Sequence, residues 1–96
     1  MKAQIFEYSA WIKETDSEVI KNQMQQLLAQ SGFNIVGYIE HYFELQGYTA
    51  IWLLAESHLA IHTFPEQGKT YLQISSCNSY KHNLFCDLIS KRQSNC

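Results

Sequence analysis

Residues 58–77 read His-Leu-Ala-Ile-His-Thr-Phe-Pro-Glu-Gln-Gly-Lys-Thr-Tyr-Leu-Gln-Ile-Ser-Ser-Cys. The two flanks of this stretch, His58 to Phe64 and Lys69 to Cys77, are rich in β-branched and aromatic side chains, which favour strands. The Pro65-Glu66-Gln67-Gly68 segment between them carries the Pro and the Gly of a tight turn. The stretch therefore predicts an antiparallel β-hairpin.

Alternation along the second flank separates two faces of this hairpin. Successive side chains of a strand point to opposite sides of the sheet. One face receives Leu72, Ile74 and Ser76, and the other receives Tyr71, Gln73, Ser75 and Cys77. Because the second face is half polar, we expect it to meet a functional site, a dimer partner or water.

Further strands are predicted before this hairpin. Residues 33–44 and 48–55 are also rich in β-branched and aromatic residues, and they are joined by a short link around Gln46-Gly47, which predicts a second hairpin. Residues 2–11 alternate loosely and predict a first strand.

Two segments have the periodicity of helices. Thr15 followed by Glu18 has the pattern of a capping box, and apolar residues then recur at helical spacing until Ser31-Gly32. Residues 81–90 place four apolar side chains on one helical stripe. The order strand, helix, four strands, helix predicts an α+β two-layer sandwich, an antiparallel sheet with two helices on one face. We expect one domain over residues 1–96.

Composition and charge argue against several classes of function. The chain is 46% hydrophobic and 17% charged, which is typical of a globular protein. A net charge of -2, with only 7 Lys and Arg residues, lacks the basic field that attracts nucleic acid. The longest apolar run, Tyr48 to Ala55, is far shorter than the ~20 residues of a membrane span, and the amino terminus has no secretion-signal pattern. We expect a cytoplasmic protein with no nucleic-acid or membrane partner.

Three short elements carry the chemistry. They are Glu56-Ser57-His58, then His62-Thr63-Phe64-Pro65-Glu66, and Cys77 near the end of the last strand. Their residues and spacing closely resemble the self-cleavage segment of the bacterial and archaeal S-adenosylmethionine decarboxylases, in a similarity that covers roughly Glu18 to Leu88. Members of that family are proenzymes that cut themselves and make a pyruvoyl cofactor from a serine.

The resemblance implies a cut between Glu56 and Ser57, into a β fragment of residues 1–56 and an α fragment of residues 57–96. Ser57 would become the pyruvoyl group, so no external cofactor is expected. His62 would serve proton transfer during processing, and Thr49 stands where the family usually has a Ser that assists it. Cys77 would be the catalytic acid.

The same resemblance implies the substrate. Phe43 and Glu66 match positions that contact substrate in the family, although Phe43 could equally be a core aromatic of its strand. The implied activity converts S-adenosylmethionine into the decarboxylated aminopropyl donor for spermidine synthesis. The alternatives are a pyruvoyl-dependent arginine or ornithine decarboxylase and a regulatory homologue that does not cleave.

The chemistry explains why these residue types are required. A peptide carbonyl is a poor electrophile, so the Ser57 hydroxyl needs a base and a stabilised oxyanion to form an ester with Glu56. Elimination from the ester leaves a dehydroalanine that becomes a ketone amide, which forms a Schiff base with a substrate amine and accepts electrons as carbon dioxide leaves. A thiol such as that of Cys77, with an ordinary pKa near ~8.5, is a competent acid for protonating the resulting carbon.

Histidines and cysteines also have simpler interpretations. His58 and His62 share a face of a strand, but no Cys or carboxylate completes a metal site at ligand spacing, so we predict no metal and expect His58 to be a packing residue. Three cysteines without a close pair predict free thiols. Among them, Cys86 is expected to be a small buried hydrophobe and Cys96 has no evident role.

Two features bear on assembly and on the substrate pocket. Ser57 and His62 have opposite parity in a regular strand, so they meet only if the strand kinks or bulges between them. The uncovered sheet face predicts a homodimer. Asn78 replaces the Gly that follows the catalytic Cys in the family, and members continue beyond the position of Cys96, so we expect part of the usual substrate pocket to be absent.

Overall fold

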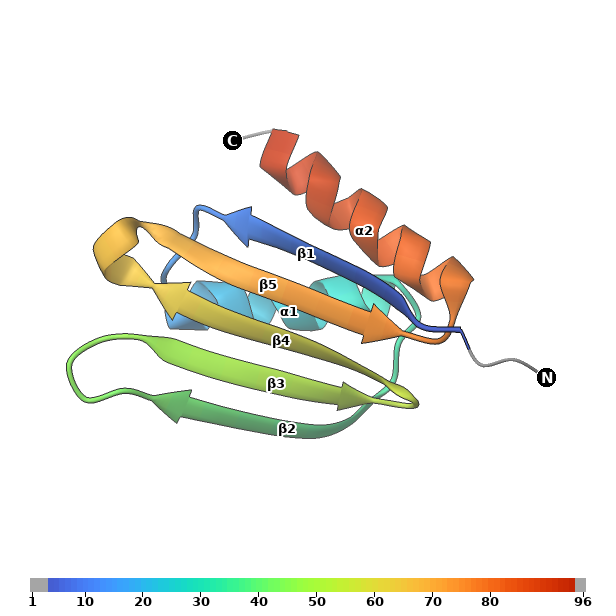
Figure 1. Ribbon diagram of the computed structural model, residues 1–96, viewed down its shortest axis with the longest axis horizontal. Coiled ribbons are helices and arrows are strands. Elements are labelled where there is room, and N and C mark those ends of the chain that lie inside the picture. Colours follow the sequence, from blue (N-terminus) through green and yellow to red (C-terminus); the bar gives the residue numbers. More distant parts are fainter. Residues whose placement is uncertain (1–3, 95–96) are drawn as a thin grey trace.

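The computed structural model describes residues 4–94, with side chains described to Lys91, and it has the predicted α+β architecture. Five strands form one sheet in the order β1-β5-β4-β3-β2, and every neighbouring pair is antiparallel. Two helices lie on one face of that sheet (Figure 1). The elements are β1 (Phe6–Ile12), α1 (Ser17–Gln30), β2 (Ile35–Tyr42), β3 (Tyr48–Leu54), β4 (Ser57–Phe64), β5 (Lys69–Ser76) and α2 (Ser79–Ser94).

The topology explains how the sheet closes. The chain forms the consecutive meander β2 to β5, and β1 then pairs with the outer edge of β5. Because β1 and β2 form opposite edges of the sheet, the segment that contains α1 must cross the whole sheet between them (Figure 1). This crossing places α1 against the face that α2 also covers.

The first helix begins one residue later than the capping-box pattern predicts. Asp16, and not Thr15, is the N-cap, because its carboxylate accepts hydrogen bonds from the backbone N–H groups of Glu18 and Val19 at 3.0 and 3.2 Å. A carboxylate also stabilises the positive end of the helix dipole. The predicted stop is confirmed, since Gly32 takes a φ of 86° directly after the helix.

Other boundaries differ from the prediction by a few residues. The strand predicted over residues 2–11 begins at Phe6, and residues 1–3 lie outside the described part of the chain. The last helix is longer than residues 81–90, since it runs from Ser79 to Ser94. Asn78 explains its early start, because the Asn78 side chain accepts a hydrogen bond from the backbone N–H of Lys81 at 3.0 Å.

The core lies between the sheet and the helices. In β3 the even-numbered residues are buried, and in β4 the odd-numbered residues are buried. This alternation is expected of a sheet that is covered on one face. Fully burying one such side chain contributes about 1.5–3 kcal/mol. The buried cluster comprises Ile12, Ile20, Met24, Leu27, Leu28, Phe33, Tyr48, Ala50, Trp52, Leu54, Leu59, Ile61, Leu72, Ile74, Phe85 and Ile89.

The two turns at the ends of β4 have different geometry. The turn predicted at residues 65–68 is a single 3-10 turn over Pro65–Gln67, closed by Gly68 at a φ of 67°. A two-residue turn of Ala55 and Glu56 connects β3 to β4. Glu56 also has a positive φ, 59°, which a residue with a β-carbon rarely adopts.

Candidate functional site

Ser57 lies directly after this strained turn, at the first position of β4. It pairs with Leu54 across the turn and with Ser76 on β5, so both neighbouring strands hold its backbone. Its side chain points to the helix-covered face and is only 7% exposed. The strand begins one residue earlier than the predicted His58 because of these two pairings.

The Ser57 hydroxyl has a specific hydrogen-bond partner. It donates to Ser76 Oγ at 3.1 Å, and Ser76 Oγ in turn donates to the carbonyl of Asn78 at 3.4 Å. The backbone N–H of Asn78 donates back to Ser76 Oγ at 3.0 Å. This short chain fixes the rotamer of the hydroxyl next to the Glu56–Ser57 peptide bond.

Cys77 lies beside the same turn. Its thiol donates a hydrogen bond to Glu56 Oε2 at a sulfur–oxygen distance of 3.4 Å, and Cys77 is exposed. This hydrogen bond to the Glu56 carboxylate raises the pKa of the Cys77 thiol. The structure therefore brings together three of the predicted residues, Glu56, Ser57 and Cys77, at one end of the sheet.

His62 and Thr49 form a separate pair. They are direct neighbours across β3 and β4, and Thr49 Oγ1 lies 3.0 Å from His62 Nδ1. Both side chains are on the face of the sheet that the helices leave open, where they alternate with buried residues. Next to them on the same face lies Tyr71, whose ring is stacked at 6.4 Å from the His62 ring.

Ser57 and His62 do not meet within one chain. The register of β4 with both β3 and β5 is continuous from Ser57 to His62, so the strand has no bulge that would reverse the parity. Five residues of strand place their α-carbons about 17 Å apart. The two side chains also point to opposite faces of the sheet.

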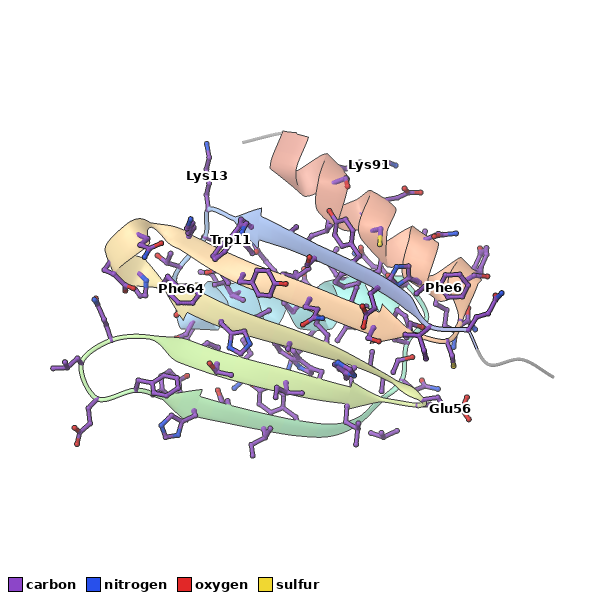
Figure 2. All side chains as sticks on the ribbon, in the orientation of Figure 1. Phe6, Trp11, Lys13, Glu56, Phe64 and Lys91 are labelled. Carbon is purple, nitrogen blue, oxygen red and sulfur yellow. The ribbon has the colours of Figure 1, made fainter. Side chains whose placement is uncertain are left out.

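The predicted substrate contacts lie with His62 and not with Ser57. Phe43 follows β2, is 51% exposed, and packs edge-on against the ring of His41 at 4.6 Å, so it is not a core aromatic. Glu66 is exposed in the turn after β4. Figure 2 shows the separation, with Glu56 and Phe6 at one end of the sheet and Trp11 and Phe64 at the other.

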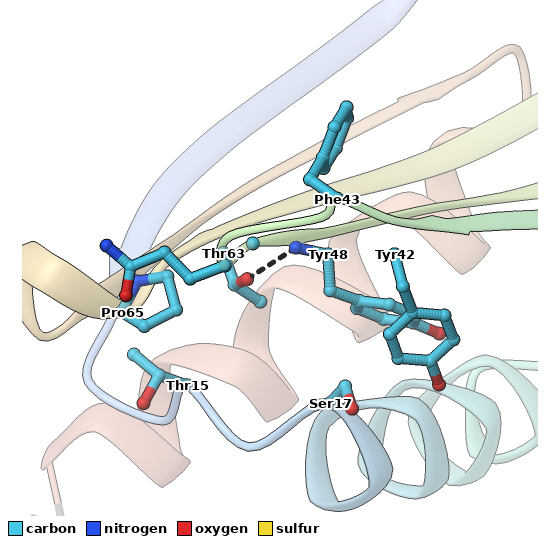
Figure 3. Close-up of a pocket in the computed structure, with 9 residues that line it drawn as sticks. Thr15, Ser17, Tyr42, Phe43, Tyr48, Thr63 and Pro65 are labelled. Carbon is cyan, nitrogen blue, oxygen red and sulfur yellow. Dashed lines mark hydrogen bonds between the residues drawn. The ribbon is translucent and has the colours of Figure 1, made fainter.

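A shallow pocket of about 260 Å³ opens beside Phe43 (Figure 3). Its floor is fixed by Thr63, whose hydroxyl accepts a hydrogen bond from the backbone N–H of Tyr48 at 2.9 Å. Two polar residues, Thr15 before α1 and Ser17 at the first position of α1, also line the pocket. The lining residues are Thr15, Ser17, Tyr42, Phe43, Gln46, Gly47, Tyr48, Thr63 and Pro65.

We refer to the two regions as the cleavage end and the aromatic end. The cleavage end comprises Glu56, Ser57, Ser76 and Cys77. The aromatic end comprises Trp11, His41, Phe43, Thr49, His62, Phe64, Glu66 and Tyr71.

Simpler interpretations of the remaining residues have mixed outcomes. The expectation that His58 packs in the interior is wrong, because His58 points to the open face and is exposed. Cys86 is partly buried in α2, and burial raises the pKa of its thiol. Cys96 lies outside the described residues.

Searches of the described residues 4–94 for other kinds of site gave two negative findings. No three His, Cys, Asp or Glu side chains in that range lie close enough together to hold a metal ion. Neither helix there has the length and apolarity needed to cross a membrane.

Comparison with known proteins gives the family of the chain. The family profile of S-adenosylmethionine decarboxylase matches residues 5–94. This chain belongs to the S-adenosylmethionine decarboxylase family. An S-adenosylmethionine decarboxylase proenzyme of Prochlorococcus marinus (strain MIT 9313) is 37% identical over 68% of the chain and 52% of that protein. One from Geobacillus sp. (strain WCH70) is 31% identical over 83% of the chain and 64% of that protein.

The chain spans about half the length of the first of these relatives. The fold agrees over a larger share of a solved structure. The adenosylmethionine decarboxylase from Aquifex aeolicus matches with a TM-score of 0.79, covering 98% of this chain and 83% of that one, at 22% identity. The two-layer fold is therefore the fold of the S-adenosylmethionine decarboxylase family.

The family motifs do not reveal every residue at the cleavage end. Ser76 holds the Ser57 hydroxyl, yet sequence analysis placed it only on a face of its strand. The buried His82 on α2 was not singled out either. It packs against Phe6 with ring centroids 6.0 Å apart, and burial lowers its pKa. The signal that would find Ser76 is the strand register. If Ser57 is paired with Ser76, both side chains face the helices and their hydroxyl groups are neighbours.

Proposed function

We propose that this chain is a self-processing, pyruvoyl-dependent decarboxylase that acts on S-adenosylmethionine. One observation carries the proposal. A serine, Ser57, lies in a fixed rotamer after a strained turn, and the thiol of Cys77 lies beside the same turn. Family membership supports the proposal, since the relatives are named as proenzymes of this decarboxylase.

Self-cleavage uses groups of the chain itself. Ser57 Oγ attacks the Glu56 carbonyl carbon, the bond from that carbon to the Ser57 nitrogen breaks, and an ester with a free amino group results. A base then removes the α-proton of residue 57, the bond between its Cβ and Oγ breaks, and Glu56 leaves as a carboxylate. The remaining dehydroalanine tautomerises to an imine, takes up water and loses ammonia, which leaves a pyruvoyl cap at position 57.

The site fits such a cap. The positive φ of Glu56 stores strain in the turn that the cut would release, and Ser76 holds the attacking hydroxyl. The cap supplies a ketone that accepts electrons during loss of carbon dioxide. The Cys77 thiol then protonates the substrate carbon. The hydrogen bond that this thiol donates to the Glu56 carboxylate raises its pKa and so favours its protonated form.

Processing also needs a base, and we assign that role to His62 of a second chain. Within one chain His62 is on the wrong face and about 17 Å from Ser57 along the strand. Packing two open sheet faces against each other, with strands running in opposite directions, would bring the aromatic end of one chain over the cleavage end of the other. The Ser57 hydroxyl faces the helices of its own chain, so the partner's His62 would reach it around the Ala55-Glu56 turn at the start of β4 and not through the sheet. The Thr49 hydroxyl, 3.0 Å from His62 Nδ1, would orient the imidazole.

The open face has the character of a dimer interface. It exposes several large apolar side chains that lie on neighbouring strands β2 and β3, and single-domain proteins rarely expose such a group without a partner. The same face carries Thr49 and His62, so the interface would include the proposed base but not the Ser57 hydroxyl, which faces the helices. Exposed members are Ile39 (68%), Ile51 (38%) and Leu53 (54%).

Substrate recognition would fall to the aromatic end. The exposed ring of Phe43 can stack on a flat heterocycle such as adenine, and the Glu66 carboxylate can accept hydrogen bonds from ribose hydroxyls. These are the features by which S-adenosylmethionine differs from a free amino acid. A dimer would place them next to the cap of the partner chain.

The proposal is tested by mass and by product. Purified protein should consist of residues 1–56 and a pyruvoyl-capped fragment 57–96, while Ser57→Ala should keep the full mass. Carbon dioxide release should be fastest from S-adenosylmethionine when arginine and ornithine are offered in parallel assays. An uncleaved wild-type chain after prolonged incubation would overturn the proposal, and turnover of only a free amino acid would overturn the substrate.

A further inference from the structure

Glu56 is the residue that the proposed cut releases, and its side chain has an unusual setting. Its backbone has a φ of 59° in an exposed two-residue turn, where Gly, Asn or Asp is the common choice. A glutamate there costs conformational energy without burying any apolar surface. A role for the carboxylate itself would explain why a glutamate occupies this position.

The contact of the carboxylate identifies that role. Glu56 Oε2 accepts a hydrogen bond from Cys77 Sγ at 3.4 Å, between two positions that are 21 residues apart in the sequence. The contact depends on the antiparallel pairing of Ser57 with Ser76. Glu56 precedes Ser57 and Cys77 follows Ser76, so this pairing places the two residues opposite each other. An ionised carboxylate can only accept hydrogen bonds, so this hydrogen bond exists only while the thiol keeps its proton.

We propose that Glu56 is a positioning residue for Cys77, whose carboxylate holds the thiol protonated and directed at the scissile turn. The use of that thiol as the acid rests on the proposed function, but its contact with Glu56 is present in the uncleaved chain. Cleavage would leave Glu56 as a chain end with a second carboxylate. The step that makes the cap would therefore also complete the environment of the acid.

Other charged groups near Cys77 are less well placed. Glu7 on β1 and His58 on β4 both lie opposite Ser75, two residues before Cys77 and on the same face of the sheet. Lys81 lies on the first turn of α2, where its backbone bonds to Asn78. Among the residues that the structure describes, Glu56 is the one with a hydrogen bond to the thiol, and it raises the pKa of Cys77.

The test is the pH dependence of thiol alkylation in the full-length Ser57→Ala chain, which cannot cut itself. Iodoacetamide reacts with the thiolate, so its rate reports how much of Cys77 has lost its proton. Removing the Glu56 charge should lower the pKa of the thiol. We expect Glu56→Gln to raise the alkylation rate of Cys77 at neutral pH several-fold and to shift the rate profile towards lower pH.

Two further variants separate the effect of the Glu56 charge from the effect of the turn conformation. Glu56→Gly suits the positive φ and also removes the carboxylate, so it should raise the Cys77 rate as Glu56→Gln does. Glu44→Gln removes a charge from the loop after β2 and should leave the profile unchanged. Alkylation of Cys86, read from its own peptide in the same samples, should stay constant and reports that the fold is intact.

The results separate this inference from the proposed function. Coinciding profiles of Glu56→Gln, Glu56→Gly and the parent chain would overturn the role of Glu56, even if wild-type protein cleaves and decarboxylates. Shifted profiles would support it even if wild-type protein never cleaves. In cleaved protein, Glu56→Gln should move the alkaline loss of kcat to lower pH, because the acid must keep its proton and the variant thiol loses it sooner.

Discussion

The cleavage end and the aromatic end belong to one small sheet but are built in different ways. At the cleavage end, hydrogen bonds connect Glu56 to Cys77 and Ser57 to Ser76, and the second of these contacts is buried. At the aromatic end, ring contacts dominate, and rings such as that of Phe43 are half exposed. The cleavage end holds the atoms that would react in self-cleavage, and the aromatic end exposes rings that a substrate or a second chain could contact.

The two ends differ in which face of the sheet carries the groups that would react. A nucleophile on the covered face and its candidate base on the open face, separated by a continuous strand, cannot form one active site in one copy. A bulge in β4 between Ser57 and His62 would place both side chains on one face, but the strand has none. We therefore propose that a second chain supplies the base.

The largest expected effect is the loss of His62. Replacement by alanine removes the proposed base, so self-cleavage should slow by about 10²–10⁴-fold, the usual contribution of a general base. Time courses of the intact mass would measure the rate. The ring of His62 lies on the open face, so thermal unfolding should change little. Cleavage at the wild-type rate would show that the base lies elsewhere.

The two faces of the sheet should also respond differently to loss of an isoleucine. Ile74 is fully buried on the covered face, so Ile74→Ala should lower the free energy of unfolding by about 2–5 kcal/mol in urea titrations. Ile51 is 38% exposed on the open face, and its replacement by alanine should cost the single chain about 1 kcal/mol or less.

The second variant should instead shift the mass in sedimentation from dimer towards monomer. Equal losses of folding stability at both positions, with an unchanged sedimentation mass, would contradict the assignment of the open face to an interface.

A smaller effect is expected at Thr49. Thr49→Val removes the hydroxyl next to His62 Nδ1 but keeps the shape of the side chain, so cleavage should slow several-fold. Thr49→Ser keeps the hydroxyl and should cleave at close to the wild-type rate. Quantifying both fragments over time measures this effect, and equal rates for the Val and Ser variants would show that the hydroxyl has no part in processing.

Much of the fold follows from the sequence, and the reasons are local. The segment around Pro65 and Gly68 has turn chemistry that few other structures satisfy, and the strands on either side alternate regularly. The helix start was misplaced because both Thr15 and Asp16 can cap a helix, and only the backbone geometry distinguishes them. The early start of α2 depends on a capping contact by Asn78.

The candidate site was only partly predictable. The resemblance to the family implies roles for Ser57, His62 and Cys77, which remain predictions, and the parity of a strand correctly indicated that Ser57 and His62 lie on opposite faces. The contact between Glu56 and Cys77 could not be inferred, because it depends on which residues pair across β4 and β5. The exposure of His58 was missed because alternation groups His58 with His62 on one face, and only the packing of the helices shows that this face is the open one.

The central claim, that one active site is shared by two chains, is tested most directly with a mixed dimer. Differently tagged Ser57→Ala and His62→Ala chains are co-expressed and isolated by both tags, and each variant alone is the control. The account predicts that the mixed dimer cleaves, and that only the His62→Ala chain is cut, because it has Ser57 and receives His62 from its partner. A mixed dimer in which both chains keep their full mass, while a doubly tagged wild-type dimer cleaves, would contradict the claim.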